Sequence, residues 1–310
     1  MAEEKDLLDI AVIGGGPAGL TAAIYGVRGG FSTAVFGGPA TGGQLLQTME
    51  IENFPGFPNP TSGFDLMTKM INQAKRLGAK VLSEQVSEIA FVCCPFKITA
   101  GGKEYFSKTV ILATGAEAKW LNLPSEQKFM GKGVSVCATC DGFFYKEKEV
   151  CVIGGGDTAA EDSLFLTKFA KKIYLVHRRD QLRAAFILQE KLRSNPKIEI
   201  IYDHVPANIL GEGKVSGIEL KNVKSGETRK LDVSGVFVAI GHTPNTALLK
   251  DKVHLDDQGY VLVSPKFETS VPGVYAAGDV CDQIYKQAIV AAGSGCMAAM
   301  NAIKYLEMKG

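Results

Sequence analysis

The sequence has few cysteines, no excess charge of either sign and no long hydrophobic run. Its seven cysteines among 310 residues are too few for a disulfide-stabilised scaffold, and the odd count leaves at least one thiol without an intrachain disulfide partner. The 34 basic and 33 acidic side chains give a net charge of +1, which offers no basic field for nucleic acid and no polybasic patch for a membrane. The sequence contains no run of about 18 apolar residues, which is the pattern that would indicate a membrane-spanning helix.

The start of the chain lacks the features of a secretory signal, because MAEEKDLLDIAVIGGG is acidic and continues directly into an apolar strand. We therefore expect a cytoplasmic protein whose thiols are mostly reduced, in which a disulfide serves catalysis rather than structure. With 46% hydrophobic and 22% charged residues the chain is expected to be globular, and its length suggests about two domains.

Two glycine-rich loops, each placed between a predicted strand and a predicted helix, form an internal repeat. The first, GGGPAG at 14–19, follows a buried strand at 8–13, and the second, GGGDTA at 154–159, follows a strand at 150–153. In a dinucleotide-binding unit the first glycine makes the tight turn, the second admits the pyrophosphate to the backbone, and the third lets helix and strand pack closely. Each loop therefore predicts a bound dinucleotide, and for the first a plain strand-to-helix turn is the alternative. The other expected elements are strands at 33–36, 110–113, 173–176, 236–240 and 274–277 and helices at 20–28, 61–77, 158–170 and 287–307.

The residues that follow the second strand of each unit differ in kind. In the first unit Phe36, Gly37 and Gly38 stand where an acid would hold the ribose, so we expect the backbone of residues 37–44 to hold it instead. In the second unit this place carries basic residues, namely His177, Arg178, Arg179 and, further on, Arg183. Arginine here accommodates the 2′-phosphate of NADP, whereas an acid would bind the ribose of NAD. The cluster predicts NADPH, with a solvated basic turn as the alternative.

A CxxC motif, CATCDG at 137–142, lies between the two loops. Cys137 and Cys140 can form a disulfide if they open a helical turn, and a CxxC context favours thiolate chemistry. The alternatives are two inert core thiols or a zinc site. Zinc would need further ligands at suitable spacing, so we predict a redox pair and no metal. Asp141 directly follows and is a candidate proton donor to a departing thiolate, or else a helix N-cap.

The other five cysteines have no assigned role. Cys93 and Cys94 are adjacent and are expected in a strand or turn, because a disulfide between neighbours would close a strained ring. Cys151, Cys281 and Cys296 lie in apolar segments and are expected in the core.

Taken together, the motifs resemble those of the low-molecular-weight thioredoxin reductases over essentially the whole chain. The matching segments are GGGPAG (14–19), GGQL (42–45), ENFPGF (52–57), ATG (113–115), CATCDG (137–142), GGGDTA (154–159), HRRDQLR (177–183), AIGHTPN (239–245), YAAGDV (275–280) and KQAIVAAGSGCMAA (286–299). Each segment is modestly specific alone, but their order and spacing are highly specific. Lys286 is a small departure, because the family often has arginine there.

The resemblance implies FAD on the first glycine loop and NADPH on the second. It places Gln44 and Asn53 near the flavin, Asp279 on the ribityl chain, and Gln287 and Ala288 against the flavin ring. The expected FAD-binding residues are Gly14, Gly16, Pro17, Ala18, Gly19, Gly37, Gly43, Gln44, Leu45, Asn53, Val86, Ala113, Thr114, Gly115, Gly278, Asp279, Lys286, Gln287 and Ala288. The expected NADPH-binding residues are Gly154, Gly156, Asp157, Thr158, Ala159, His177, Arg178, Arg179, Arg183, Ile240 and Gly241.

The resemblance also implies an α/β fold of two Rossmann-like three-layer dinucleotide-binding domains, with the NADPH domain inserted into the FAD domain. The FAD domain is expected at 1–116 and 245–310, and the NADPH domain, which carries the CxxC, at 117–244. Crossings near 114–117 and 241–245 would form a double-stranded hinge. Because nicotinamide and CxxC both need the same flavin, the inserted domain is expected to rotate between two states.

The activity implied is that of a thioredoxin-disulfide reductase. Electrons would pass from NADPH through FAD and the Cys137/Cys140 disulfide to oxidised thioredoxin or a thioredoxin-like protein. In the family Cys140 is the flavin-side sulfur, Cys137 attacks the partner, and members are homodimers; no nucleic acid or membrane is expected as a partner. One alternative is a flavoprotein reductase of another partner, such as a glutaredoxin-like protein or a peroxidase component. The other is a nucleotide-sensing protein in which the CxxC is structural.

Overall fold

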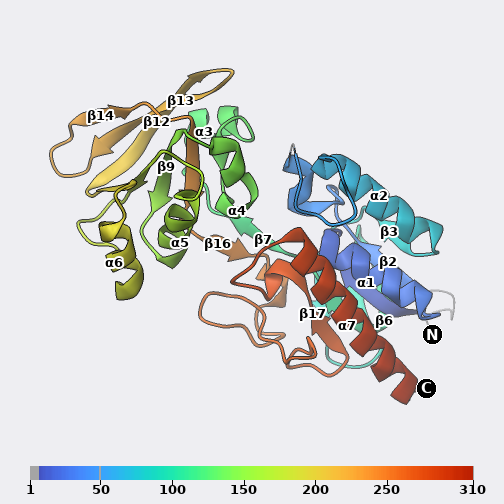
Figure 1. The fold of residues 1–310 in the computed structure, drawn as a ribbon. Helices are drawn as coiled ribbons and strands as arrows, with labels where there is room; N and C mark the ends of the chain where they lie inside the picture. Colours follow the sequence, from blue (N-terminus) through green and yellow to red (C-terminus); the bar gives the residue numbers. More distant parts are fainter. Residues whose placement is uncertain (1–6, 49, 310) are drawn as a thin grey trace. The chain divides into compact units, whose positions relative to one another are not determined.

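The chain folds into two compact units. The computed structural model describes residues 7–48 and 50–309 (Figure 1). Unit 1 comprises Met1–Glu117 and Thr243–Gly310, and unit 2 comprises Ala118–His242. Unit 2 is therefore an insertion within unit 1.

The chain passes between the units along two short strands that pair with each other, β7 (Ala116–Ala118) and β16 (His242–Pro244). Unit 2 and the expected insertion, 117–244, differ only by residues of these crossing strands. Beside them Thr114 Oγ1 donates to the Asn245 carbonyl oxygen at 2.7 Å, and Asn245 Nδ2 donates to the Thr114 carbonyl oxygen at 3.1 Å. The two crossings are thus fastened together by side chains as well as by strand pairing.

Unit 1 is built on a seven-stranded sheet. Strand β1 is central, β2 and β3 follow on one side, and β6 and then β17 follow on the other, all in parallel. The first half of β6 also pairs with β5 in an antiparallel arrangement, and β5 pairs with β4. The strands are β1 (Leu7–Ile13), β2 (Thr33–Phe36), β3 (Lys80–Leu82), β4 (Val86–Ala90), β5 (Phe96–Ala100), β6 (Lys103–Leu112) and β17 (Val274–Ala276).

Helices cover one face of this sheet. Successive side chains of a strand point to opposite faces, so Ile10 and Val12 of β1 join the core beneath the helices, while Ala11 and Ile13 join the core on the other face. The second face is closed by side chains of β4 and β5 and of the stretch from 248 to 263. The helices are α1 (Pro17–Arg28), α2 (Gly63–Arg76) and α7 (Ala288–Lys309), with short 3-10 helices η2 (Gly43–Gln47), η4 (Ala247–Leu249) and η5 (Gly278–Val280).

Helix α7 is long and apolar enough, by length and composition, to cross a membrane, and no other helix of the described residues is. In unit 1 it packs closely on α1. A Cβ on Gly295 would collide with the Ala18 carbonyl oxygen, and Ala298 and Ala299 are fully buried in the core. Such a close approach of two helices needs small side chains, so packing within unit 1 accounts for the small buried residues of α7. The larger apolar side chains of Ile289, Met297 and Met300 on the same helix are exposed.

Unit 2 repeats this plan around strand β9. Its parallel five-stranded sheet has the order β11-β10-β9-β15-β8. Val150 and Val152 face a core shared with the helices, whereas Cys151 and Ile153 face a core shared with the antiparallel sheet β12-β13-β14. The strands are β8 (Val134–Ser135), β9 (Glu149–Gly154), β10 (Lys172–Val176), β11 (Ile198–Ile201), β12 (His204–Glu212), β13 (Lys214–Asn222), β14 (Thr228–Leu231) and β15 (Gly235–Ala239). The helices are α3 (Pro124–Phe129), α4 (Ala138–Asp141), η3 (Gly142–Tyr145), α5 (Asp157–Leu166) and α6 (Phe186–Ser194).

The predicted fold class is therefore confirmed: there are two α/β units, each built on parallel strands that lie between two covering layers. In both units the central strand, β1 or β9, leads through a glycine loop into a helix. The carboxyl end of a central parallel strand is where such sheets bind ligands.

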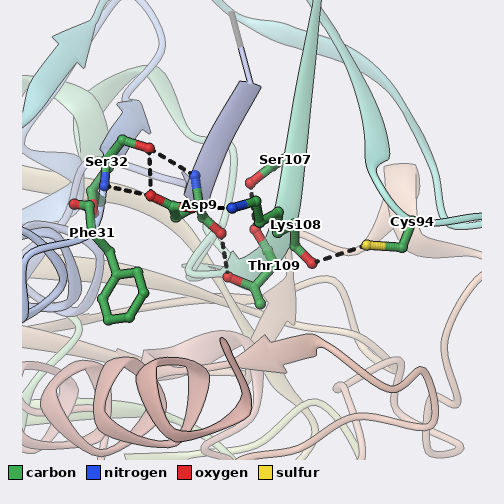
Figure 2. A network of polar contacts seen from close by, with 8 residues as sticks. Asp9, Phe31, Ser32, Cys94, Ser107, Lys108 and Thr109 are labelled. Atoms are coloured by element: carbon green, nitrogen blue, oxygen red, sulfur yellow. Dashed lines mark hydrogen bonds and ion pairs between the residues drawn. The ribbon is translucent and has the colours of Figure 1, made fainter. Parts of the chain in front are cut away.

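A polar network near the start of β1 links this strand to the residue before β2 and to the second half of β6 (Figure 2). The Asp9 carboxylate accepts hydrogen bonds from the Ser32 backbone N at 2.9 Å and from Ser32 Oγ at 2.8 Å, and it forms an ion pair with Lys108 Nζ at 2.8 Å. Thr109 Oγ1 donates to the Asp9 carbonyl oxygen at 2.8 Å. Burial opposes ionisation, but the bonds from Lys108 and Ser32 together hold the pKa of Asp9 below its usual value. This network holds β1, β2 and β6 in register at the end of β1 that lies away from the glycine loop.

Candidate active site and cofactor sites

Cys137 and Cys140 are joined in a disulfide at the start of α4. Cys137 is the N-cap residue of this short helix, so its Sγ accepts a hydrogen bond from the Cys140 backbone N at 3.2 Å. Thr139 Oγ1 lies 3.4 Å from the same sulfur. Cys137 is half-buried and Cys140 is exposed. The helical turn that the CxxC spacing requires for a disulfide is thus present.

Asp141 ends α4 beside the disulfide. The Asp141 backbone N donates to the Cys137 carbonyl oxygen at 3.1 Å. The Ser135 side chain hydrogen-bonds to the Asp141 carboxylate. Ser135 Oγ also accepts a hydrogen bond from the Cys137 backbone N at 3.0 Å. Burial raises the pKa of Asp141, and the Ser135 hydrogen bond only partly opposes the shift. The alternative role of Asp141 as a helix cap is not supported, because Asp141 stands at the N-cap position of η3 but its side chain makes no capping hydrogen bond there.

The first glycine loop brings the backbone of unit 1 into close contact. Gly14 has a φ of +117°, and a Cβ there would collide with the Ala113 carbonyl oxygen. A Cβ on Gly19 would collide with the Gly14 carbonyl oxygen, so helix and strand could not approach as they do. Gly16 instead faces open space, and no side chain caps the N-terminus of α1 behind it. This leaves backbone N–H groups and the positive end of the helix dipole available to a phosphate.

The other segments expected at this loop lie around it. A Cβ on Gly43 would be 3.4 Å from the Gly16 Cα, and one on Gly278 would be 2.9 Å from the Ala18 Cβ. Gly37, which follows β2, also lies against the loop: a Cβ on Gly15 would be 2.9 Å from the Cα of Gly37. The sequence therefore identified segments that are distant along the chain and adjacent in unit 1.

Amide side chains link two further segments of unit 1. Gln44 Nε2 donates to the Ala116 carbonyl oxygen, and Asn53 Nδ2 donates to Gln287 Oε1 at 3.3 Å. Among the expected residues, Leu45 packs against the core under the helices and Val86 is buried in the core on the other face. Only the backbone of Val86 is available to a ligand. Thr114 and Gly115 lie at the crossing, and Lys286 and Ala288 stand at the start of α7.

Asp279 lies in the turn η5, behind Gly278. Burial raises the pKa of Asp279 to about 6, with a further increase from the nearby Asp282 carboxylate and a decrease from Lys286. Ser294 Oγ on α7 accepts from the Gly278 backbone N at 2.9 Å and holds this turn against the helix. Asp279 is half-buried and forms no ion pair within the described part of the chain, so its carboxylate can accept hydrogen bonds from ligand hydroxyl groups.

The second glycine loop has the same features in unit 2. Gly154 is packed against Ala239 and Ala159, whereas Gly156 faces open space, and no side chain caps α5. Ile240 and Gly241 directly follow Ala239 at the end of β15.

The basic cluster stands next to this loop. His177 is buried, a Cβ on Gly155 would collide with its ring, and its Nε2 has no hydrogen-bond partner among the described residues. Burial lowers the pKa of His177, and the charges of Arg183, Arg178 and Arg179 lower it further. All three arginines are exposed, and none forms an ion pair within the described part of the chain.

Comparison with known proteins identifies the family. The model of the pyridine nucleotide-disulphide oxidoreductase family matches residues 8–295. The chain belongs to this family. It is 49% identical over 303 residues to a thioredoxin reductase of Rickettsia conorii, covering 96% of this chain and 98% of that protein. It is 47% identical over 301 residues to a bifunctional thioredoxin reductase/thioredoxin of Mycobacterium leprae, covering 96% of this chain and 66% of that protein. A solved thioredoxin reductase of Giardia duodenalis superposes with a TM-score of 0.94 at 44% identity, covering 97% of this chain and 99% of the other.

The resemblance to thioredoxin reductases that the motifs indicate is thereby confirmed. The protein is therefore an oxidoreductase, and its family uses a flavin and a nicotinamide nucleotide. The disulfide between Cys137 and Cys140 fits that chemistry.

Several residues that shape these sites were not found from the sequence. They are Ser135 beside the disulfide, Asn245 at the crossing, and Ser294 behind the Gly278 turn. Asn245 and Ser294 lie inside matched segments, AIGHTPN and KQAIVAAGSGCMAA, but their roles depend on partners more than ten residues away. Ser135 precedes the CxxC by two residues, and a hydroxyl so close to a reactive turn is the kind of signal that could have marked it.

The remaining cysteines only partly follow expectation. Cys93 and Cys94 are exposed in the connection between β4 and β5, as a turn position implies, and Cys151 is fully buried. Cys281 and Cys296 are not fully buried. Cys296 lies on the outer side of α7, where its Sγ approaches the Met300 Sδ at 3.8 Å, so its apolar neighbours in sequence do not place it in the core.

Proposed function

We propose that this protein is an NADPH-dependent thioredoxin reductase that uses FAD and the Cys137–Cys140 disulfide to reduce the disulfide of oxidised thioredoxin. The observation that carries the proposal is this disulfide at the exposed start of α4, in a unit with its own glycine loop and arginine cluster. The Mycobacterium leprae relative supports the choice of partner, because its name joins the reductase with thioredoxin in one protein.

Unit 1 fits FAD. Gly14, Gly16 and Gly19 form a loop that would accept a pyrophosphate at the uncapped start of α1, and Asp279 would accept hydrogen bonds from the ribityl hydroxyls. The acid that usually binds the ribose is absent, so the backbone of the 37–44 stretch, which packs on the loop, would bind it. FAD held by these residues would supply a two-electron carrier between a nicotinamide and a disulfide.

Unit 2 fits NADPH. Gly156 and the uncapped start of α5 would take the pyrophosphate, and Arg178, Arg179 and Arg183 would take the 2′-phosphate. The orphan Nε2 of buried His177 provides one more polar group at the same place. The remaining expected residues of both units, listed with the sequence, belong to this proposal.

The chain's own residues then carry out the thiol chemistry. Two electrons break the S–S bond, and two protons complete the dithiol. Negative charge on Cys137 Sγ is stabilised by the Cys140 N–H and the Thr139 hydroxyl, so Cys137 attacks the partner disulfide and forms a mixed disulfide. Asp141 lies beside the disulfide, and burial raises the pKa of its carboxyl, so it is the group placed to protonate the departing thiolate. Cys140 attacks Cys137 Sγ, releases the reduced partner and restores the disulfide.

Three further features belong to the proposal. Unit 2 rotates on the crossings β7 and β16, because the nicotinamide and the CxxC both need the flavin of unit 1. The protein acts in the cytoplasm, which agrees with five free cysteines, two of them exposed. It works as a homodimer, as implied by its family resemblance.

The test is turnover with a panel of oxidised partners. NADPH oxidation should be fast with a thioredoxin and slow with a glutaredoxin-like protein or a peroxidase component, and it should disappear in the Cys137→Ser variant. Fast turnover with one of the other partners and none with thioredoxin would instead identify a different partner class. Absence of turnover with all of them, with nucleotide bound, would support the nucleotide-sensing alternative.

A further inference from the structure

We propose that Asp157 and Gln189 are positioning residues for cofactor choice. They hold the arginine loop, defined here as residues 177–185, in the one conformation that recognises a 2′-phosphate. The inference rests on the proposed function, in that unit 2 is taken to bind NADPH. Asp157 is one of the expected NADPH-binding residues, and this inference makes its contribution indirect. Neither Asp157 nor Gln189 carries positive charge, and both act through the arginine loop rather than by contacting the 2′-phosphate.

The arginine loop needs such support. Its three guanidinium groups are exposed and have no carboxylate partner among the described residues, so nothing in their own contacts fixes their direction. Like charges repel, and a loose loop would let the three side chains spread apart. Recognition of a phosphate by guanidinium forks depends on their convergence, which the backbone of the loop must impose.

The end of the loop is fastened to the second glycine loop. Asp157 Oδ1 accepts a hydrogen bond from the Ala185 backbone N at 2.7 Å. Ala185 is the N-cap residue of α6, and Asp157 is the first residue of α5. The Gly155 carbonyl oxygen accepts from the backbone N of Arg183 at 2.6 Å and of Ala184 at 3.1 Å. The backbone that carries Arg183 is thus bound directly to the loop expected to hold the pyrophosphate.

A second side chain holds the loop from the side of α6. Gln189 Nε2 donates to the Ala184 carbonyl oxygen at 2.7 Å, and the Leu182 and Ala184 side chains are buried in the core of unit 2. The start of the loop is secured separately, since the His177 carbonyl oxygen accepts from the His204 backbone N at 3.1 Å. Asp157 and Gln189 therefore complete a set of anchors at the end that carries Arg183.

Because Asp157 is negatively charged, a charge effect and a positioning effect predict opposite changes in phosphate binding when it is removed. A carboxylate close to a phosphate site repels the phosphate, so an account based on charge alone predicts tighter binding when Asp157 is removed. An account based on position predicts weaker binding, because the Ala185 N–H loses its acceptor and the arginine loop loosens. Asparagine keeps an oxygen at Oδ1 and removes the charge, which separates the two effects.

The experiment measures binding of 2′,5′-ADP and of 5′-AMP, which lacks the 2′-phosphate, to the oxidised protein by calorimetry. We expect Asp157→Ala to weaken 2′,5′-ADP by roughly five- to thirtyfold, the effect of one lost charge-assisted hydrogen bond, and to change 5′-AMP by less than about threefold. Asp157→Asn should keep the wild-type preference. Gln189→Ala should reproduce the loss in part, and Glu161→Ala, which removes an exposed carboxylate from the same helix, should have no effect.

Amide hydrogen exchange supplies a readout that does not depend on the nucleotide. In Asp157→Ala and Gln189→Ala, peptides covering 177–185 should exchange faster, while those of β9 and β10 should not change. Equal or tighter 2′,5′-ADP binding by both variants would overturn the proposal, as would an equal loss for both nucleotides. A wild-type protein that binds 2′,5′-ADP no better than 5′-AMP would overturn the NADPH assignment itself, whatever the variants do.

Discussion

At the scale of single residues, the two sulfurs of the disulfide differ in their surroundings. Only Cys137 Sγ receives the hydrogen bond from the Cys140 backbone N and lies near the Thr139 hydroxyl. These groups stabilise a thiolate on Cys137 after reduction, and a thiolate is the species that attacks a disulfide.

This difference predicts which variant traps the partner. Cys140→Ser should form a stable mixed disulfide with thioredoxin, because Cys137 attacks and no second thiol resolves the adduct. Cys137→Ser should give little of that adduct. Non-reducing gels and mass spectrometry of the chemically reduced variants, each mixed with oxidised thioredoxin, measure the result. A stable adduct from Cys137→Ser alone would reverse the assigned roles.

Asp162 on α5 predicts a pH dependence of stability. Burial, and then the charge of Glu161, raises the pKa of Asp162 to about 7, well above the usual value of an aspartate. The folded state therefore holds a proton that the unfolded state releases, and stability falls as the pH rises from about 4 to about 7. Asp162→Asn should be more stable than wild type by about 1–3 kcal/mol at pH 8 and equal to it at pH 4.

Trp120 reports this change directly. It is the only tryptophan of the chain and packs against a core of unit 2, so its fluorescence during urea unfolding follows the unit that contains Asp162. Glu190→Gln, which neutralises an exposed carboxylate on α6, is the control and should not change the profile. A wild-type stability that does not fall between pH 4 and pH 7 relative to Asp162→Asn would contradict the raised pKa.

The residues of the CxxC turn could be predicted from the sequence, whereas the residues that hold neighbouring segments in place could not. Cys137, Cys140 and Asp141 follow from local spacing, because a disulfide between residues three apart fits one helical turn. Ser294 and Asn245 could not be derived, since each acts on a carbonyl or amide group that folding brings from elsewhere in the chain. The alternative of a capping role for Asp141 is not supported, because its side chain makes no capping hydrogen bond although it stands at the N-cap position of η3.

At the scale of elements, the proposed function assigns the choice of nicotinamide nucleotide to the loop after β10. Arg178→Ala combined with Arg179→Ala should lower kcat/KM for NADPH by about a hundredfold to ten-thousandfold, because two charge-assisted hydrogen bonds of roughly 1.5–3 kcal/mol each are lost. NADH has no 2′-phosphate and should lose far less. The FAD spectrum and the thiol chemistry should remain intact.

Steady-state kinetics with both nucleotides measure this prediction. Lys214→Ala combined with Lys221→Ala removes the same charge from exposed positions of β13 and is the matched control. An unchanged preference for NADPH over NADH in the arginine variant would mean that the basic cluster is a solvated turn.

Elements with a strong local pattern were predicted, and those without one were not. Strand 33–36 was predicted with both boundaries correct, because four buried residues in succession suit a strand of a covered parallel sheet. Helix α2 begins at Gly63 rather than at the expected 61, since Ser62 caps it through the Asp65 backbone N. The antiparallel strands β4, β5 and β12 to β14 were missed, because their half-exposed faces give a weak alternation that tertiary pairing completes.

At the scale of the whole molecule, the insertion of unit 2 follows from the order of motifs along the chain. Segments of unit 1 stand on both sides of the CxxC and the second glycine loop, so unit 1 can be completed only after the chain returns. The exact crossing points could not be read from sequence, because β7 and β16 are three-residue strands stabilised by each other.

If unit 2 rotates during the cycle, preventing the rotation should stop turnover without releasing FAD. A crosslink between one engineered cysteine in each unit should stop turnover with thioredoxin, while FAD stays bound and reduction of the crosslink restores activity. The same two cysteines left uncrosslinked are the control. Full turnover by a protein shown to be completely crosslinked would exclude rotation as part of the cycle.

The central claim is that electrons pass from NADPH through a flavin to Cys137 and Cys140, and anaerobic NADPH addition to the oxidised protein tests it most directly. Free thiols are titrated before and after, so that the five cysteines outside the disulfide cancel in the difference. With at least two NADPH per chain, one electron pair reduces the disulfide and a second stays on the flavin. We then predict that the yellow absorbance is lost and that two new thiols appear per chain, whereas the Cys137→Ser/Cys140→Ser variant loses its colour and gains none. Loss of the colour with no new thiols in the wild-type protein, or no loss of colour at all, would contradict the account.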